Sequence, residues 1–129
     1  MAIPFEAMIP GTPRAVGMLR RKLAAMAKDC GMDAEGIADV RLAVTEAATN
    51  AVMHAYREAE GELTIAAAVQ DGVLAIVITD SGPGLVERHD SPGLGAGLSV
   101  IASVAERMKI VSSSSGTEIH MAFPCPDTD

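Results

Sequence analysis

Hydrophobic and polar positions change their period several times along the chain, and each change marks a new element. From about Pro13 to Lys28, apolar residues recur every three or four positions, which predicts an amphipathic helix. The stripe consists of Val16, Leu19, Leu23 and Met26. Thr12 supplies a capping hydroxyl in front of a proline at the first helical position, and Gly31 ends the helix. The cations on this helix lie mostly off the stripe, which indicates a solvated face or, alternatively, a docking surface for a partner protein.

A second helical pattern begins after Asp33, a suitable capping residue, and continues to about Tyr56. Its apolar residues occupy two sides of the helix, which predicts a helix lying between a sheet and a further layer or a ligand. One stripe consists of Ile37, Val40, Val44, Ala47, Ala51 and Ala55. The roughly opposite side carries Leu42, Glu46, Asn50 and Met53.

Strand patterns dominate the rest of the chain. Residues alternate between apolar and polar or small side chains from Leu63 to Gln70, and Asp71-Gly72 is a strong hairpin signal. The segment from Val73 to Thr79 is almost continuously apolar, so we expect a central strand covered on both faces. Three further strands are expected at Ala2–Met8, Met108–Val111 and Thr117–Phe123, and a third helix at Leu98–Arg107.

Composition narrows the class of protein. A chain of 129 residues that is 49% hydrophobic suits a single folded domain spanning residues 1–129, and 2% aromatic residues imply an aliphatic core. A net charge of −7 without a long Lys/Arg run argues against a direct nucleic-acid surface. No apolar run is long enough for a membrane span and no signal peptide precedes the domain, so a cytoplasmic location is expected. Cys30 and Cys125, far apart in sequence, fit a reducing compartment.

Glu46 and Asn50 lie one turn apart on the same face of the second predicted helix, among apolar residues. Ordinary hydrogen-bond partners within the fold would satisfy them. A functional alternative is a Mg²⁺ ion with a phosphate chain, because an amide oxygen is a suitable ligand for this hard cation. Glu46 would then orient or deprotonate the nucleophile that attacks the terminal phosphate.

Two glycine-containing segments follow the central strand. Asp80, Gly82 and Gly84 form either an ordinary acidic turn or a site in which the carboxylate accepts a hydrogen bond from the adenine amine and the glycines let the backbone approach the base. Gly93, Gly95 and Gly97 form either a flexible loop or a mobile lid that leads into a helix N-terminus able to receive phosphates. No Gly-Lys-Ser/Thr sequence occurs, so the segment is not a Walker loop. Thr117 is either a plain strand residue or an adenine or water contact.

Taken together and in this order, these residues resemble the GHKL ATPase superfamily. Its N-box is similar to Glu46-x-x-x-Asn50, and its two glycine boxes are similar to Asp80-x-Gly82-x-Gly84 and Gly93-x-Gly95-x-Gly97. Gly116-Thr117 is similar to the start of its last strand. The resemblance implies an α+β fold, a two-layer α/β sandwich with a mixed, mostly antiparallel sheet covered by helices. It also implies ATP and Mg²⁺ as cofactors, with Asn50 as the metal ligand and Glu46 as the catalytic base. The residues that it places against the nucleotide are Asn50, Asp80, Gly82, Gly84, Gly93, Gly95, Ala96, Gly97, Leu98 and Thr117.

Within the superfamily, the segment from Glu46 to Tyr56 is most similar to bacterial anti-sigma-factor serine/threonine kinases. This resemblance implies a homodimer that sequesters a sigma factor and phosphorylates a serine of an anti-anti-sigma (STAS-type) protein. Two alternatives remain open at this point. The chain could act as a non-catalytic, nucleotide-gated binding module, or as a stand-alone ATPase.

Overall fold

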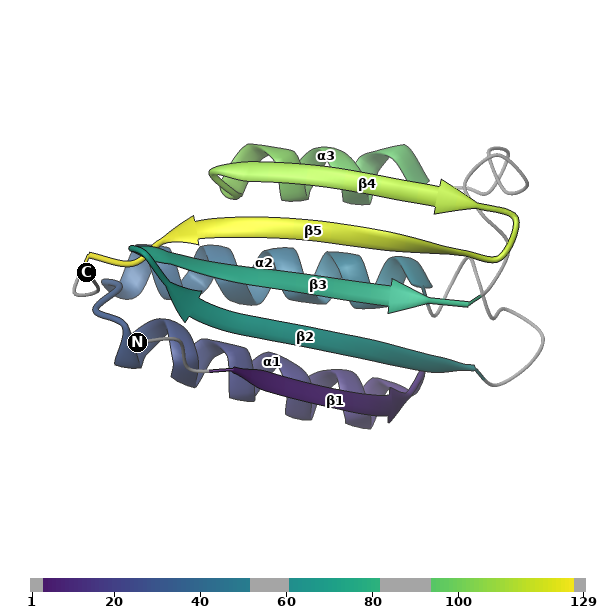
Figure 1. The fold of residues 1–129 in the computed structure, drawn as a ribbon, viewed down its shortest axis with the longest axis horizontal. Helices are drawn as coiled ribbons and strands as arrows, with labels where there is room; N and C mark the ends of the chain where they lie inside the picture. The colour runs from purple at the N-terminus through teal and green to yellow at the C-terminus, as the bar shows by residue number, and fades with distance from the viewer. Residues whose placement is uncertain (1–3, 52–60, 82–93, 127–129) are drawn as a thin grey trace.

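The computed structural model describes residues 4–51, 61–81 and 94–126, drawn in colour in Figure 1. Eight elements follow one another in these parts of the chain. They are β1 (Phe5–Pro10), α1 (Pro13–Asp29), α2 (Ala34–Asn50), β2 (Glu62–Gln70), β3 (Val73–Asp80), α3 (Leu94–Val104), β4 (Arg107–Ser113) and β5 (Gly116–Pro124). Five strands form one sheet in the order β1-β2-β3-β5-β4, and each of the pairings is antiparallel. All three helices lie on one face of this sheet (Figure 1), so the expected two-layer α+β sandwich is confirmed.

Local signals place the starts of α1 and α2 and the turn between β2 and β3 where the sequence predicts them. The Thr12 hydroxyl accepts a hydrogen bond from the backbone N–H of Ala15 at 3.2 Å, and the Asp33 carboxylate accepts one from Gly36 at 2.8 Å. Asp71 and Gly72 have φ angles of 54° and 77°, as a tight hairpin turn between β2 and β3 requires. Short-range chemistry therefore accounts for both helix starts and for this turn.

The core lies between the helices and the inner face of the sheet. Alternate residues of the three central strands point toward the helices, and four isoleucines lie side by side in one row across four strands. They are Ile65, Ile78, Ile119 and Ile110. Branched side chains pack well on a pleated surface, and Ile65, Ile78 and Ile119 belong to the same buried cluster as the alanines and valines of α2. The polar residues described below lie on the same face of these strands, two positions away from the isoleucines.

Two predictions about these elements are wrong. The predicted central strand does lie in the middle of the sheet as β3, but helices cover only one of its faces, and Ala75 on the other face is exposed. The open face of β3 nevertheless carries the apolar residues Val73, Ala75 and Val77, and this produced the continuous apolar pattern. The third helix begins at Leu94 instead of Leu98 and ends at Val104 instead of Arg107. The end predicted for the second helix, near Tyr56, lies outside the described residues.

The cations of α1 mostly face solvent, as the first interpretation of the sequence had it, with Arg14, Arg21, Lys22 and Lys28 exposed. Arg20 is the exception, because its guanidinium lies 3.4 Å from the Thr45 hydroxyl of α2 and joins the two helices. Within the described residues, no helix combines the length and the apolar character that crossing a membrane requires.

Candidate functional site

Five elements meet at one end of the sandwich, on the right of Figure 1. The strands β3 and β4 and the helix α2 end there, whereas α3 and β5 begin there. The described candidate residues lie close to these element ends, which brings together segments that are up to about seventy residues apart in sequence. This convergence was not visible from the sequence pattern, because it depends on the antiparallel course of the chain.

A row of three polar residues crosses the inner face of the sheet at this end. Asp80 on β3 is paired with Thr117 on β5, and Thr117 is paired in turn with Ser112 on β4. Asp80 is 4% exposed and Thr117 is 1% exposed, so a carboxylate and a hydroxyl are held almost out of water. The Ser112 and Thr117 hydroxyls lie 3.3 Å apart. Directly opposed residues in a sheet bring their side chains within contact distance, so the three form one polar edge above the isoleucine row.

Gly116 holds the two central strands of this edge in close contact. Its φ angle is 152°, a region that favours glycine, and a Cβ added there would collide with the carbonyl oxygen of Asp80. The same Cβ would lie 3.2 Å from the Asp80 carbonyl carbon and from the Ser81 Cα, both of them backbone atoms. The absence of a side chain at Gly116 therefore lets the start of β5 lie directly against the end of β3.

Glu46 lies on α2 and its carboxylate is directed at the first turns of α3. A Cβ built on Gly97 would lie 3.2 Å from the Glu46 Oε2 atom, so the missing side chain leaves room for the carboxylate. The structure thus brings the predicted catalytic base against one of the predicted glycines. No hydrogen bond or ion pair joins Glu46 to another of the described residues, so its carboxylate is not engaged in holding this part of the fold together.

Asn50 is buried near the end of α2, with 5% of its surface exposed. Its amide nitrogen has no hydrogen-bond partner among the residues that the structure describes. A buried polar atom without a partner destabilises the fold by about 1–3 kcal/mol, so such an atom is unusual unless a ligand or solvent completes it. The unpartnered nitrogen is a donor that an acceptor such as a phosphate oxygen would satisfy, whereas the amide oxygen is a suitable ligand for a hard cation.

The remaining predicted site residues fall into two groups. Gly95, Ala96, Gly97 and Leu98 belong to α3, so the second glycine segment is, at least in this part, the start of a helix. Gly82, Gly84 and Gly93 lie outside the described residues. Ser112 was missed from the sequence, because nothing in a run of four serines distinguishes the one that pairs with Thr117; only the strand register does so.

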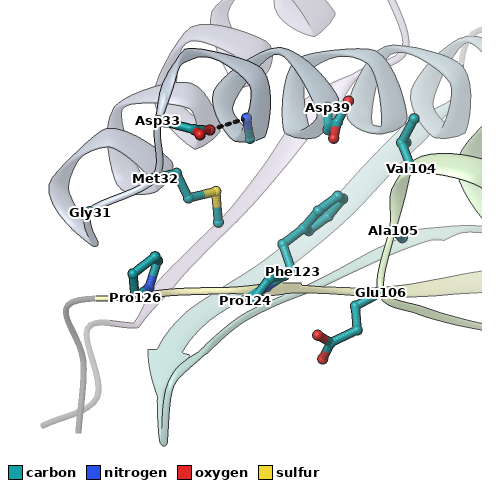
Figure 2. A pocket seen from close by; sticks show the side chains of 11 residues that line it. Gly31, Met32, Asp33, Asp39, Val104, Ala105, Glu106, Phe123, Pro124 and Pro126 are labelled. Atoms are coloured by element: carbon teal, nitrogen blue, oxygen red, sulfur yellow. Dashed lines mark hydrogen bonds between the residues drawn. The ribbon is translucent and has the colours of Figure 1, made fainter.

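A separate cavity of about 450 Å³ lies at the opposite end of the sandwich (Figure 2), between the start of α2, the end of β5 and the connection from α3 to β4. Asp33, Asp39 and Glu106 contribute carboxylates to its lining, and Phe123 points into it from β5. The Asp33 carboxylate is already used to cap α2. Within the described part of the chain, no three His, Cys, Asp or Glu side chains are grouped to hold a metal ion.

The two cysteines also meet at that opposite end, although 94 residues separate them in the sequence. Both are reduced thiols, and each residue is 3% exposed. Burial, and then the neighbouring Cys30 thiol, raise the pKa of Cys125 from 9.0 to about 12. The sequence indicated a reducing compartment but not this contact, which depends on how the end of α1 packs against the segment after β5.

The three helices cover one face of the antiparallel sheet, so the fold is a two-layer α/β sandwich. Its candidate site lies at one end, where buried polar groups gather between the end of α2 and the start of α3. The chain belongs to the family of histidine kinase-like ATPase domains, whose family model matches residues 9–123. The match includes every residue of the polar row, both described residues of the α2 site and all of α3. The superfamily resemblance seen in the sequence is therefore confirmed.

Characterised relatives are similar over much of this region. An anti-sigma F factor of Clostridium acetobutylicum is 33% identical over 114 residues, which cover 79% of this chain and 80% of the relative. A serine-protein kinase RsbW of Bacillus subtilis is 38% identical over 79 residues, covering 60% of this chain and 49% of the relative. The match to the RsbW kinase of Bacillus licheniformis is 35% identical and covers 58% of that relative. The chain thus spans between about half and three fifths of the kinases it matches.

The fold recurs in solved structures. The RsbU and RsbW domains of Rv1364c from Mycobacterium tuberculosis superpose with a TM-score of 0.74 at 23% identity, over 95% of this chain and 32% of the other. A histidine kinase domain from Erythrobacter litoralis superposes with a TM-score of 0.62 at 21% identity, over 85% of this chain and 61% of the other. At these identities the similarity concerns the architecture alone.

Proposed function

We propose that this chain is an ATP-dependent protein serine/threonine kinase that regulates a sigma factor. The observation that carries the proposal is the buried Asn50 amide with an unpartnered atom, one helical turn from a Glu46 carboxylate that faces the start of α3. The names of the relatives, an anti-sigma F factor and several serine-protein kinases, support it. By analogy with them, the partners are a sigma factor and a STAS-type anti-anti-sigma protein, and the active form is a homodimer in the cytoplasm.

Each residue of the site has a role in this proposal. The Asp80 carboxylate accepts a hydrogen bond from the adenine amine, and Thr117 beside it contacts the base directly or through water. The start of α3, with Gly95 and Gly97, receives phosphate oxygens on its free backbone N–H groups. Gly82, Gly84, Gly93, Ala96 and Leu98 complete the nucleotide contacts.

Asn50 would hold Mg²⁺ through its amide oxygen. When bound there, the ion supplies positive charge that neutralises the phosphate oxygens. The unpartnered amide nitrogen of Asn50 is a donor, so a phosphate oxygen of the nucleotide would satisfy it while the amide oxygen holds the ion.

Glu46 acts as the general base. Its carboxylate takes the proton from the serine hydroxyl of the partner protein as that oxygen bonds to the γ-phosphorus atom. The bond from the γ-phosphorus to the bridging oxygen breaks at the same time, and ADP leaves with the electron pair. General-base catalysis of this kind contributes about a hundredfold to ten-thousandfold in rate.

Titration calorimetry with ATP, with and without Mg²⁺, tests the nucleotide site on the parent and on Asp80→Asn. We expect Mg²⁺-dependent binding in the parent and a loss of affinity in the variant, whose amide has one acceptor oxygen in place of two and no charge to strengthen the hydrogen bond from the adenine amine. Absence of ATP binding by the parent would refute the kinase proposal.

Glu46→Gln separates binding from catalysis, because the amide has the shape of the carboxylate but cannot take the proton. The variant should bind ATP as the parent does and transfer phosphate to serine of a STAS-type protein at least a hundredfold more slowly. Equal transfer rates would remove the base assignment. Nucleotide-dependent binding of that protein without any phosphoserine in the parent would indicate a non-catalytic binding module.

A further inference from the structure

Ser112 lies outside every motif that the family resemblance supplies, yet it extends the polar row by one strand. It is paired with Thr117 across β4 and β5, on the side of the sheet that faces the helices. Its hydroxyl lies 3.3 Å from that of Thr117. Thr117 is 1% exposed, whereas Ser112 belongs to the edge strand and is exposed. The buried hydroxyl next to Asp80 is therefore contacted from the solvent side by a second hydroxyl.

The direction of the Thr117 hydroxyl matters for recognising a base. A threonine hydroxyl has one proton to donate and two lone pairs to accept with, and it rotates to suit its neighbours. An ionised aspartate only accepts hydrogen bonds, so Asp80 matches the amine of adenine and opposes the carbonyl oxygen that guanine has in the same place. The adjacent ring nitrogen is an acceptor in adenine and a donor in guanine. A neighbouring group that donates toward this nitrogen favours adenine, and one that accepts from it favours guanine.

We propose that Ser112 is a positioning residue that turns the Thr117 hydroxyl toward the purine and so increases the preference for ATP over GTP. In this proposal Ser112 is the donor of the 3.3 Å contact and Thr117 Oγ1 is the acceptor, so the Thr117 proton points away from Ser112, toward the side on which Asp80 and the base lie. This inference rests on the proposed nucleotide-binding function. It adds to that function a residue on an edge strand which itself touches no part of the nucleotide.

The geometry also sets the size of the effect. A separation of 3.3 Å between two hydroxyl oxygens is longer than the usual 2.7–2.8 Å, so the bond is at the weak end of its range. Removing a hydrogen bond of this kind changes an equilibrium by about twofold to tenfold, and a change of about threefold is expected here. Because Ser112 is exposed on an edge strand, its truncation should leave the melting temperature almost unchanged.

Three variants test the role by calorimetric titration with ATP and with GTP in saturating Mg²⁺. Ser112→Ala removes the hydroxyl, and Ser112→Thr retains it on a residue that suits a strand. Ser113→Ala is the matched control, since the Ser113 hydroxyl contacts Ser115 in the turn at 2.8 Å and not the polar row. We expect the ratio of GTP to ATP dissociation constants to fall about threefold in Ser112→Ala only, with ATP affinity accounting for most of the change.

The outcomes separate this inference from the proposed function. A parent that binds no ATP refutes both. A parent that binds ATP, together with a Ser112→Ala variant of unchanged ATP-to-GTP preference, refutes the positioning role alone. An equal loss of ATP and GTP affinity, or an equal effect of Ser113→Ala, indicates a general effect on the strand and also refutes it. Recovery of the preference in Ser112→Thr supports the role, because a merely structural contribution of the side chain would not change the choice of base.

Discussion

Replacing Gly116 by alanine tests the packing that holds the polar row together. The added Cβ would collide with the Asp80 carbonyl oxygen, and two further backbone atoms lie 3.2 Å away. No side-chain rotation relieves a collision with backbone, so the start of β5 must move away from the end of β3. Overpacking of this kind costs about 1–3 kcal/mol, and a side chain at a φ of 152° adds about 1–3 kcal/mol of strain.

We therefore expect Gly116→Ala to lower the free energy of unfolding by about 2–4 kcal/mol, allowing for partial relaxation. A domain of this size loses about 4 °C in melting temperature per kcal/mol, so the midpoint should fall by about 8–16 °C. Urea denaturation followed by circular dichroism measures the free energy, and differential scanning calorimetry measures the midpoint. The movement also separates Thr117 from Asp80, so ATP affinity should fall as well.

Gly17→Ala is the matched control for this substitution. Gly17 lies within α1, and its added Cβ would make an ordinary contact at 3.7 Å with the flexible side chain of Arg21. Alanine favours a helix over glycine by up to about 1 kcal/mol, so this variant should be as stable as the parent or slightly more stable. A Gly116→Ala variant that melts within about 2 °C of the parent would refute the close approach of the two strands.

Three further predictions concern the α2 site and the cysteines. Gly97→Ala should change the free energy of unfolding by less than about 1 kcal/mol but slow phosphate transfer about tenfold or more. The added Cβ would lie 3.2 Å from the Glu46 Oε2 atom, so the carboxylate must move away from its position. An unchanged transfer rate would contradict this prediction. Asn50→Leu should raise the free energy of unfolding by about 1–2 kcal/mol in urea titrations and abolish Mg²⁺-dependent ATP binding, whereas a destabilised variant would show that the amide has a partner. At pH 8, Cys125 should react with Ellman's reagent about a thousandfold more slowly in the native protein than in urea. Its pKa is raised to about 12 in the fold, from 9.0 for an ordinary thiol, so the native thiol stays protonated and unreactive. Equal rates would place the thiol at the surface.

Local chemistry explains which features of the fold were predictable. Caps such as Thr12 and Asp33 and the hairpin at Asp71-Gly72 act within a few residues, so they appear directly in the sequence. The helix boundary at Leu98 was misplaced because glycine disfavours a helix by about 1 kcal/mol, yet α3 includes Gly95 and Gly97. Packing against α2 overrides that local preference, and the bare Gly97 backbone is also what admits the Glu46 carboxylate. Gly97 is thus one reason why the helix start was predicted too late, and it also leaves room for the Glu46 carboxylate in the proposed site.

By itself, the sequence determined the approximate positions of the helices and strands and the chemical identity of the candidate groups, because these follow from short-range periodicity and residue type. The α+β class was implied by the resemblance to the GHKL ATPases. The tertiary structure alone decided which groups meet. The strand register, set by contacts between distant segments, places Asp80, Thr117 and Ser112 in one row. The packing of α3 against α2 brings Gly97 to Glu46. At the other end, the packing of the end of α1 against the segment after β5 brings Cys30 to Cys125. A local pattern carries no information about these pairings, since a shift of one residue in register would turn every side chain of a strand to the opposite face.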